Sequence, residues 1–281
     1  MDAEEHRRRS REHWDAAAPG WERRERWMRE TSAPVSAWLI DAVHLQPGHR
    51  VLELAAGTGD VGLMAAELIL PGGRLISSDR SGPMLTVARA RAAALGLGNV
   101  DFKLLDGEAI DLPLAAVDAV ICRWGYMLMA DPGAALRETR RVLRPGGRLA
   151  LAVWDDIEAN PWSRIPTAAI VAHGLLEPAE PGEPGPFALG DVDRLRGLLE
   201  EAGFAGIEID AVDLERPDPD FATWWEGHLG MSSVARGAVS GAPADVVAAV
   251  RAEVEAELRP FTRPDGSLLV PARTLVAAAD A

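Results

Sequence analysis

Short apolar runs and longer amphipathic segments alternate regularly along the chain between residues 50 and 153. Apolar runs predict strands at 51–54, 74–78, 100–104, 117–122 and 148–153, and the segments between them predict helices at 60–70, 83–95 and 132–143. Strands that are separated by helices of about 10 to 15 residues pair in parallel. The pattern therefore predicts an α/β fold built on a doubly wound sheet.

Both flanks of this region depart from the alternation. Residues 4–30 are polar and predict a helix that breaks at Pro19-Gly20, and residues 34–43 predict a further short helix. Pro178 to Pro186 is rich in proline and glycine and predicts an exposed loop. A helix at 191–202 and a strand at 206–210 resume the alternation, and the last apolar run, 274–279, suits a closing strand or a helix equally well.

These elements predict a core interrupted by two insertions. We expect an N-terminal helical arm at 1–44, a core formed by 45–154, 189–215 and 265–281, and a cap inserted as 155–188 and 216–264. With the last two strands included, the core is expected to be a seven-stranded, mainly parallel sheet with helices on both faces.

Charge and composition narrow the kind of partner. The net charge of −14 opposes binding to nucleic acid, because phosphate backbones attract clustered cations. The first 30 residues include Arg7-Arg8-Arg9, but eight arginines there face eight acids, which indicates a solvated, ion-paired helix face. No run approaches the roughly 20 apolar residues that span a bilayer, and the N-terminus is polar, so we expect a cytoplasmic protein. We expect it to form a monomer or homodimer. The single cysteine, Cys122, sits in an apolar run and is expected to be a buried thiol.

A glycine-rich turn joins the first predicted strand to the helix that begins near Asp60. Glycines at such a turn let the backbone approach a ligand closely, and the first helical turn offers free N–H groups to an anion. Gly57, Gly59 and Gly62 fit the dinucleotide fingerprint G-x-G-x-x-G, with Asp79 twenty residues after Gly59 in the place of a ribose-binding acid. The turn therefore predicts a ligand site, with a dinucleotide as one candidate.

Three further features favour a different ligand. Glu53 lies directly before the glycine turn, where its charge would repel a pyrophosphate but receive the amino group of a methionine moiety. Asp106 follows the third predicted strand, where it would accept a hydrogen bond from an adenine amino group. The turn at 144–148, with two glycines, feeds the fifth strand. Together they favour a nucleoside bearing an amino acid over a dinucleotide.

In these segments the chain resembles the class I S-adenosylmethionine-dependent methyltransferases, and within them the branch similar to the ubiquinone/menaquinone-biosynthesis methyltransferases. The likeness covers roughly residues 45–153, with a weaker match at 198–204, and rests on four ordered segments: 53–60, 78–85, 106–109 and 142–147. The broad class most often has glycine where this chain has Ala55, whereas the quinone-type branch tolerates alanine. The likeness to that branch is not convincing beyond residue 154, so it does not imply a quinone precursor as substrate.

The resemblance implies a set of cofactor-binding residues: Glu53, Ala55, Gly57, Gly59, Asp79, Arg80, Met84, Asp106, Gly107, Glu108, Arg123 and Trp124. Within this set, Glu53 and the glycine turn would surround the methionine part of S-adenosylmethionine. Asp79 would bind the ribose hydroxyls, while Met84 and Asp106 would contact the adenine. Arg123 and Trp124 would lie near the sulfonium.

The acceptor side of the site is less clearly marked. If the acceptor is a hydroxyl, an acid/base residue would help, and Tyr126, His173 and His228 are the candidates, with a surface or packing role favoured for each histidine. Nine tryptophans stand against five phenylalanines and one tyrosine, and broad aromatic faces suit both an apolar acceptor and the packing of cap helices. The residues expected to line the acceptor pocket are Trp14, Trp21, Tyr126, Trp154, Trp162 and Trp225.

The expected function is the transfer of a methyl group from S-adenosylmethionine to an O, N or C atom of a largely apolar small molecule, with no metal. Catalytic roles are assigned to Tyr126 and His228 on the condition that a base is needed. Two alternatives stay open. One is a binding or cyclising protein that keeps the S-adenosylmethionine site without methylating, and the other is a nicotinamide-dependent oxidoreductase.

Overall fold

A seven-stranded sheet forms the centre of the computed structural model, which describes residues 3–178 and 182–281. In the order in which they pair, its strands are β3 (Val100–Leu104), β2 (Arg74–Asp79), β1 (Arg50–Glu53), β4 (Val117–Arg123), β5 (Leu143–Trp154), β7 (Leu268–Asp280) and β6 (Ala205–Asp218). The pairs among β1 to β5 are parallel, and β7 runs antiparallel to both β5 and β6. The predicted seven-stranded, mainly parallel sheet is confirmed.

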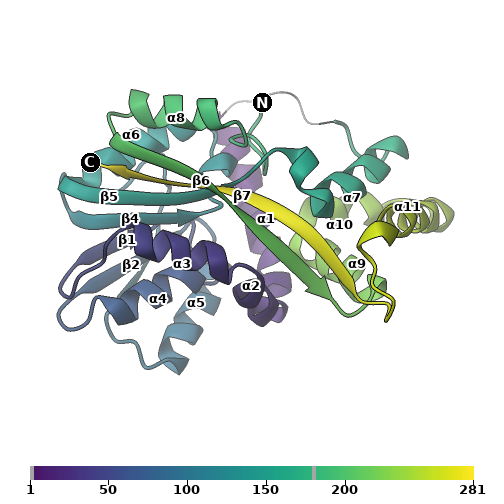
Figure 1. The fold of residues 1–281 in the computed structure, drawn as a ribbon, viewed down its shortest axis with the longest axis horizontal. Coiled ribbons are helices and arrows are strands. Elements are labelled where there is room, and N and C mark those ends of the chain that lie inside the picture. The colour runs from purple at the N-terminus through teal and green to yellow at the C-terminus, as the bar shows by residue number, and fades with distance from the viewer. Residues whose placement is uncertain (1–2, 179–181) are drawn as a thin grey trace.

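Helices cover both faces of this sheet (Figure 1). On one side lie α3 (Ala33–Ala42), α4 (Asp60–Leu68) and α5 (Gly82–Ala94), and on the other lie α6 (Pro132–Val142) and α8 (Val192–Glu201). Local sequence fixes where three of them begin: the side chains of Ser81, Asp131 and Asp191 accept hydrogen bonds from N–H groups in the first turns of α5, α6 and α8. Sequence and packing therefore agree over most of the core.

The N-terminal helices differ from the prediction at one point. The break expected at Pro19-Gly20 is wrong, because α1 (Ala3–Arg23) continues through both residues. Gly20 is buried where a side chain would collide with the carbonyl of Gly230, so close packing on another helix holds this turn in helical form. The short α2 (Glu25–Thr31) follows.

The C-terminal strands are much longer than predicted. The expected strand at 206–210 is only the first part of β6, and the run left open between strand and helix belongs to β7. The two strands stay paired from Ala205 with Asp280 to Asp218 with Leu268. In Figure 1 they extend beyond the sheet as a long ribbon toward a separate group of helices.

That group is formed by the two segments that interrupt the core sequence. It contains α7 (Pro161–Ala172), α9 (Phe221–Met231), α10 (Ser233–Ser240) and α11 (Ala244–Glu257), which share a hydrophobic core of their own that includes Ile165, Trp224 and Val250. Short 3-10 turns lie at Tyr126–Leu128, Ile157–Ala159 and Arg259–Phe261. Residues 179–181 of the predicted loop at 178–186 lie outside the described residues. Within the described ranges, no helix is long and apolar enough to cross a membrane.

Helix α1 lies between the helices that cover the sheet and the separate group of helices (Figure 1). It contacts α5 on the sheet side, and it contacts α9 and α10 on the other side. The expected ion pairing of its arginines is present, since Arg8 pairs with Glu5 and Glu12. The arm is therefore packed against both parts of the molecule.

Candidate cofactor and acceptor site

The strand order reverses between β1 and β4, and ligands of doubly wound sheets bind at such a point, beyond the carboxyl ends of the strands. The chain leaves β1 here and forms the loop from Leu54 to Gly59 before α4 begins at Asp60. The loop residues 55–57 are half-buried between buried neighbours on both sides. The sequence motif and the topology thus identify the same edge of the sheet.

The three glycines of the motif have three different roles. A side chain built on Gly57, whose φ is +54°, would meet nothing within 4 Å, so this glycine faces open space. Gly59 has a φ of +83°, and a Cβ added to it would lie 3.1 Å from the Cβ of Ala88, so a glycine is needed there for folding. A side chain at Gly62 would collide with the carboxylate of Glu53. Only Gly57 leaves a cradle that a ligand can fill.

Glu53 is a buried carboxyl group behind this cradle. Its Oε1 accepts the N–H of Gly62 at 2.7 Å and its Oε2 accepts the hydroxyl of Ser77 at 2.9 Å. Burial raises the pKa of Glu53 to about 7, although both hydrogen bonds oppose the shift. Gly62, the third glycine of the dinucleotide pattern, therefore gives space and an N–H group to the buried carboxyl group of Glu53. The pattern G-x-G-x-x-G thus has an explanation inside the protein and no longer favours a dinucleotide.

Ala55 adopts a φ of +51°, and its methyl group lies beside Gly125, which follows β4. A Cβ on Gly125 would lie 2.6 Å from that methyl and 2.5 Å from the sulfur of Cys122. The missing side chain at Gly125 thus makes room for the methyl group of Ala55. Cys122 is fully buried, as expected, and burial raises the pKa of its thiol to about 12.

Asp79 ends β2 and joins the glycine loop to α5. Its carboxylate accepts the N–H of Gly57 and the N–H of Ser81, both at 2.8 Å, and burial raises its pKa. The side chain that caps α5 is Ser81, through the N–H of Met84. Asp79 therefore lies directly beside the open cradle and organises it, while its ribose role stays a prediction.

Asp106 and its neighbours form the next edge of the crevice. Arg80 donates to Asp106 at 2.8 Å, and Arg7 of helix α1 donates to Glu108 from its Nε at 3.1 Å. The other oxygen of Glu108 accepts the N–H of Ala130. At Gly107, a side chain would meet the end of Met129. The predicted acceptor of the adenine amino group is thus already paired with an arginine.

Helix α1 covers this edge. Asp15 accepts the hydroxyl of Ser81 at 2.6 Å, and the buried Met84 packs against α1 rather than facing open space. Trp14 and Trp21 belong to the same cluster, and the indole N–H of Trp21 donates to the carbonyl of Met231 at 3.2 Å. The two tryptophans and Met84 therefore hold the arm in place, and the pocket and adenine contacts expected of them stay predictions.

Arg123 is paired with other side chains in the structure, and its place near the sulfonium stays a prediction. Its guanidinium donates to Asp60 at 2.8 Å and to the hydroxyls of Ser32 and Ser36, which places it between α3 and α4. Asp60 also accepts from Arg91 at 2.6 Å, so one buried acid joins two arginines. The sequence analysis treated Asp60 only as the start of a helix. An acid in the first turn of a helix is favoured by the helix dipole, and this was the available signal for a buried carboxylate here.

Both catalytic candidates, Tyr126 and His228, contact other side chains in the structure. The structure does not favour the role predicted for Tyr126, because its side chain is fully buried, its hydroxyl lies 2.6 Å from that of Thr139, and burial raises its pKa well above the usual value. His228 stacks on Trp224, with 5.3 Å between ring centroids, and burial together with Arg216 lowers its pKa to about 4. His173 pairs with Glu253 at 3.0 Å, in the surface packing role expected of it.

Three tryptophans form a continuous wall that begins at the switch point. Trp124, directly after β4, stacks on Trp154 with 4.3 Å between ring centroids, and Trp154 contacts Trp162 at 4.9 Å. The indole of Trp124 donates to the hydroxyl of Thr274 at 3.0 Å. Trp225, also expected to line the pocket, is instead buried in the hydrophobic core of α7 and α9 to α11.

The family of the methyltransferase domain matches this chain over residues 45–203. The chain belongs to this family. The membership confirms the resemblance drawn from the four sequence segments, and it favours a methyltransferase over the oxidoreductase alternative. The glycine loop, Glu53, Asp79 and Asp106 all lie inside the matched range.

Two relatives of this chain are named as methyltransferases as well. It is 36% identical over 188 residues to a ubiquinone/menaquinone biosynthesis C-methyltransferase, UbiE, of Pseudoalteromonas translucida, covering 63% of this chain and 72% of the relative. The UbiE of Pasteurella multocida is 38% identical over 127 residues, and the match spans 45% of this chain and only 47% of that relative. Among solved structures, the YcgJ protein of Bacillus subtilis superposes with a TM-score of 0.58 at 18% identity, covering 88% of this chain and 98% of that one, which supports the fold.

Proposed function

We propose that this protein transfers a methyl group from S-adenosylmethionine to an O, N or C atom of a largely apolar small molecule. The observation that carries the proposal is the open space over Gly57 at the strand switch point, with the buried carboxyl groups of Glu53 and Asp79 beside it. The family membership supports the same activity. An open position beside two buried acids suits a ligand that carries an amino acid and a ribose where it contacts the backbone of the glycine loop.

The donor set fits S-adenosylmethionine, which when bound supplies an electrophilic methyl group on a sulfonium. Gly57 gives the close approach, and Asp79 is placed to accept the ribose hydroxyls while it keeps the loop closed on β2. Glu53 would hold the amino group, because a bound ammonium favours the carboxylate form of a group whose pKa is about 7. Asp106, paired with Arg80, would receive the adenine amino group.

Positioning is the main contribution of the protein to the reaction. Methyl transfer is an in-line displacement, so alignment and exclusion of water supply much of the rate. Trp124 and Trp154 provide broad, buried faces next to the switch point. Tyr126 is in the core, and a histidine with a pKa of about 4 is a weak proton acceptor, so neither side chain is assigned as a general base.

The cofactor assignment is tested by filling the cradle. Gly57→Leu should reduce the affinity for S-adenosylhomocysteine at least about 100-fold in calorimetry, because the side chain occupies the space that the cofactor needs. Gly48→Leu is the matched control, since Gly48 also has a positive φ, +88°, and nothing within 4 Å of its side-chain position, but precedes β1. Equal affinities in the two folded variants would place the cofactor elsewhere, and binding of a nicotinamide dinucleotide in its stead would refute the assignment.

Transfer itself is tested with isotope-labelled S-adenosylmethionine and a mixture of small metabolites, with labelled products traced by mass spectrometry. The expected result is a labelled small molecule that is absent with Gly57→Leu. Tight binding of S-adenosylhomocysteine without any labelled product would favour the alternative of a protein that keeps the cofactor site without methylating.

A further inference from the structure

Arg216, on β6, is a buried cation that the sequence analysis did not single out. The residue is 6% exposed, and its guanidinium carbon lies 4.4 Å from the ring centroid of Trp162 and 4.7 Å from that of Trp27. Within the described part of the chain, its buried Nε has no hydrogen-bond partner. Buried polar groups are normally paired, so this N–H group lacks an acceptor.

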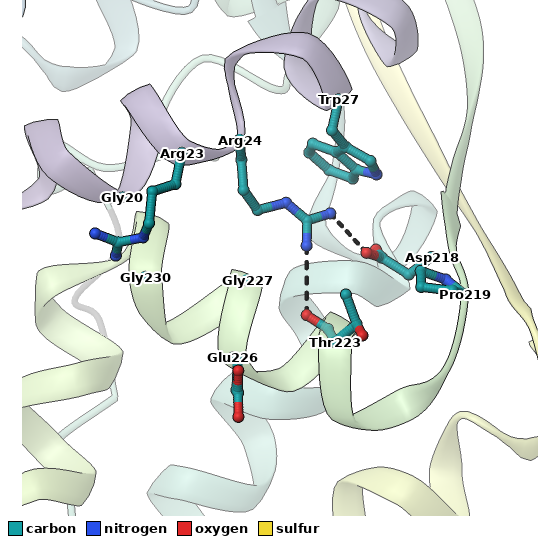
Figure 2. Close-up of a pocket in the computed structure, with 10 residues that line it drawn as sticks. All are labelled: Gly20, Arg23, Arg24, Trp27, Asp218, Pro219, Thr223, Glu226, Gly227 and Gly230. Atoms are coloured by element: carbon teal, nitrogen blue, oxygen red, sulfur yellow. Dashed lines mark hydrogen bonds and ion pairs between the residues drawn. The ribbon is translucent and has the colours of Figure 1, made fainter.

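A second guanidinium beside it is only partly satisfied. Arg24, between α1 and α2, donates from one terminal nitrogen to Asp218 at 2.6 Å and from the other to the carbonyl of Thr223 at 3.3 Å (Figure 2). Its Nε is buried as well, and no residue that the structure describes accepts a hydrogen bond from it. Arg24 and Arg216 line the same small chamber, so two cations there have a donor without an acceptor.

The charges around this chamber do not cancel. Its lining includes two arginines and one acid, Asp218, which is already hydrogen-bonded to Arg24. Arg216 stays protonated at pH 7, although burial lowers its pKa to about 9. His228 contributes no charge at pH 7, because burial and Arg216 lower its pKa to about 4. One positive charge is therefore left in excess, and a buried excess charge favours an anion.

The size of the chamber limits which anion can enter. Its volume is about 10 Å³, which has room for about one water-sized particle. This size excludes phosphate, sulfate and organic acids, and it admits a water molecule or a monatomic anion. A water molecule would accept hydrogen bonds from the arginines but leave the charge unbalanced, whereas a halide ion does both.

The chamber lies where three parts of the chain meet. Trp27 belongs to the N-terminal arm, Arg216 to the β6–β7 ribbon, and Trp162 and Trp224 to helices α7 and α9. A groove of about 430 Å³ between α1, α2 and α9 shares Trp27 with the chamber, so solvent reaches the outer side of the same wall. A particle in the chamber contacts the arm, the ribbon and the separate group of helices at once.

We propose that this chamber is a halide site, in which a chloride ion accepts hydrogen bonds from the Nε–H groups of Arg24 and Arg216. The ion balances the excess charge and fastens the arm to the ribbon and to α7 and α9. Its role is to stabilise this junction, and it takes no part in methyl transfer. The inference does not rest on the function proposed above.

Thermal melting of the full chain in sodium chloride and in sodium gluconate at equal ionic strength tests the site. Both salts screen surface charges alike, but gluconate is too large for the chamber. Relative to gluconate, wild type should melt at least about 2 °C higher for each tenfold rise in chloride above half-saturation. Equal melting temperatures of wild type in the two salts at every concentration would show that the chamber holds only water, which overturns the proposal.

Substitution of Arg216 assigns the chloride effect to the chamber. Arg216→Met removes the excess positive charge, so its melting temperature should be the same in chloride and in gluconate. The control is Arg251→Gln, because Arg251 also lies over an aromatic ring, 5.7 Å from that of Phe221, but is exposed on α11. It should keep the chloride effect of wild type. A folded Arg216→Met variant that keeps the full effect would place the ion elsewhere and overturn the proposal.

Bromide locates the ion directly, because it replaces chloride and scatters X-rays anomalously. A wild-type crystal grown in sodium bromide should give an anomalous peak within hydrogen-bond distance of the Nε atoms of Arg24 and Arg216. The absence of a peak there would overturn the proposal. This measurement needs only wild type, so it decides the question even if Arg216→Met does not fold.

Discussion

The buried carboxyl group of Glu53 should make the stability of this protein depend on pH in a defined window. Burial raises the pKa of Glu53 from 4.5 to about 7. Between these two values the folded chain keeps a proton that the unfolded chain releases, so this contribution to stability is fully present below about pH 4.5 and is lost as the pH rises through 7. At about 1.4 kcal/mol for each pH unit, the loss amounts to about 3 kcal/mol.

Glu53→Gln isolates this contribution because glutamine keeps the shape of the side chain and does not titrate. Its carbonyl can accept the N–H of Gly62, and its amide can donate to the hydroxyl of Ser77. We expect urea unfolding to show that the free energy of unfolding of the variant, relative to wild type, rises by about 2–3 kcal/mol between pH 5 and pH 8. Glu67→Gln, at an exposed position on α4, should follow wild type at both pH values.

The same variant connects the buried acid to the cofactor. If the amino group of the cofactor lies beside Glu53, the affinity of wild type for S-adenosylhomocysteine should rise between pH 6 and pH 8 and stay flat in Glu53→Gln. Parallel stability curves for wild type and Glu53→Gln across this range would refute the reasoning about burial. A flat affinity in wild type would refute the contact with the amino group.

Two further substitutions test the walls of the cradle. Asp79→Ala should weaken S-adenosylhomocysteine binding about 10- to 100-fold in calorimetry, because it removes a charged acceptor and the anchor of the Gly57 N–H; an affinity equal to wild type would rule out the ribose role. Gly125→Ala should lower the free energy of unfolding by about 1–3 kcal/mol in urea titrations, because its Cβ would lie 2.6 Å from that of Ala55, and adding Ala55→Gly should recover part of the loss; no recovery would show that the two residues do not pack as described.

The core of the fold followed from local information in the chain. Hydrophobic periodicity and turn residues are sufficient to predict an element where a strand is a short apolar run or a helix begins with a capping side chain, as at Ser81 and Asp131. The predicted strand at 100–104 agrees with β3 residue for residue. The glycine motif, Glu53 and Asp79 were also identified correctly as neighbours, because topology brings the carboxyl ends of β1 and β2 to one edge of the sheet.

The sequence predicted less well where a residue depends on partners far along the chain. Tyr126 follows a strand at the ligand-bearing edge, yet its ring turns into the core, since Thr139 of α6 offers its hydroxyl there. Pro19 is a helix breaker by itself, but packing of α1 against α9 overrides it. Arg216 falls at the start of the predicted cap segment 216–264, whereas the structure places it on β6, which extends past the sheet.

The sequence by itself therefore determined the class of fold, the edge of the sheet that carries the glycine turn, and the family resemblance, because these depend on periodicity and on residues close together in the chain. Only the tertiary structure decided which side chains surround the tryptophans outside the core sheet. Trp27, Trp162 and Arg216 come from three distant segments, and their contacts are set by how the arm and the long β6–β7 ribbon pack. Side-chain burial and charge pairing arise from such long-range packing, which no local pattern of hydrophobic and polar residues encodes.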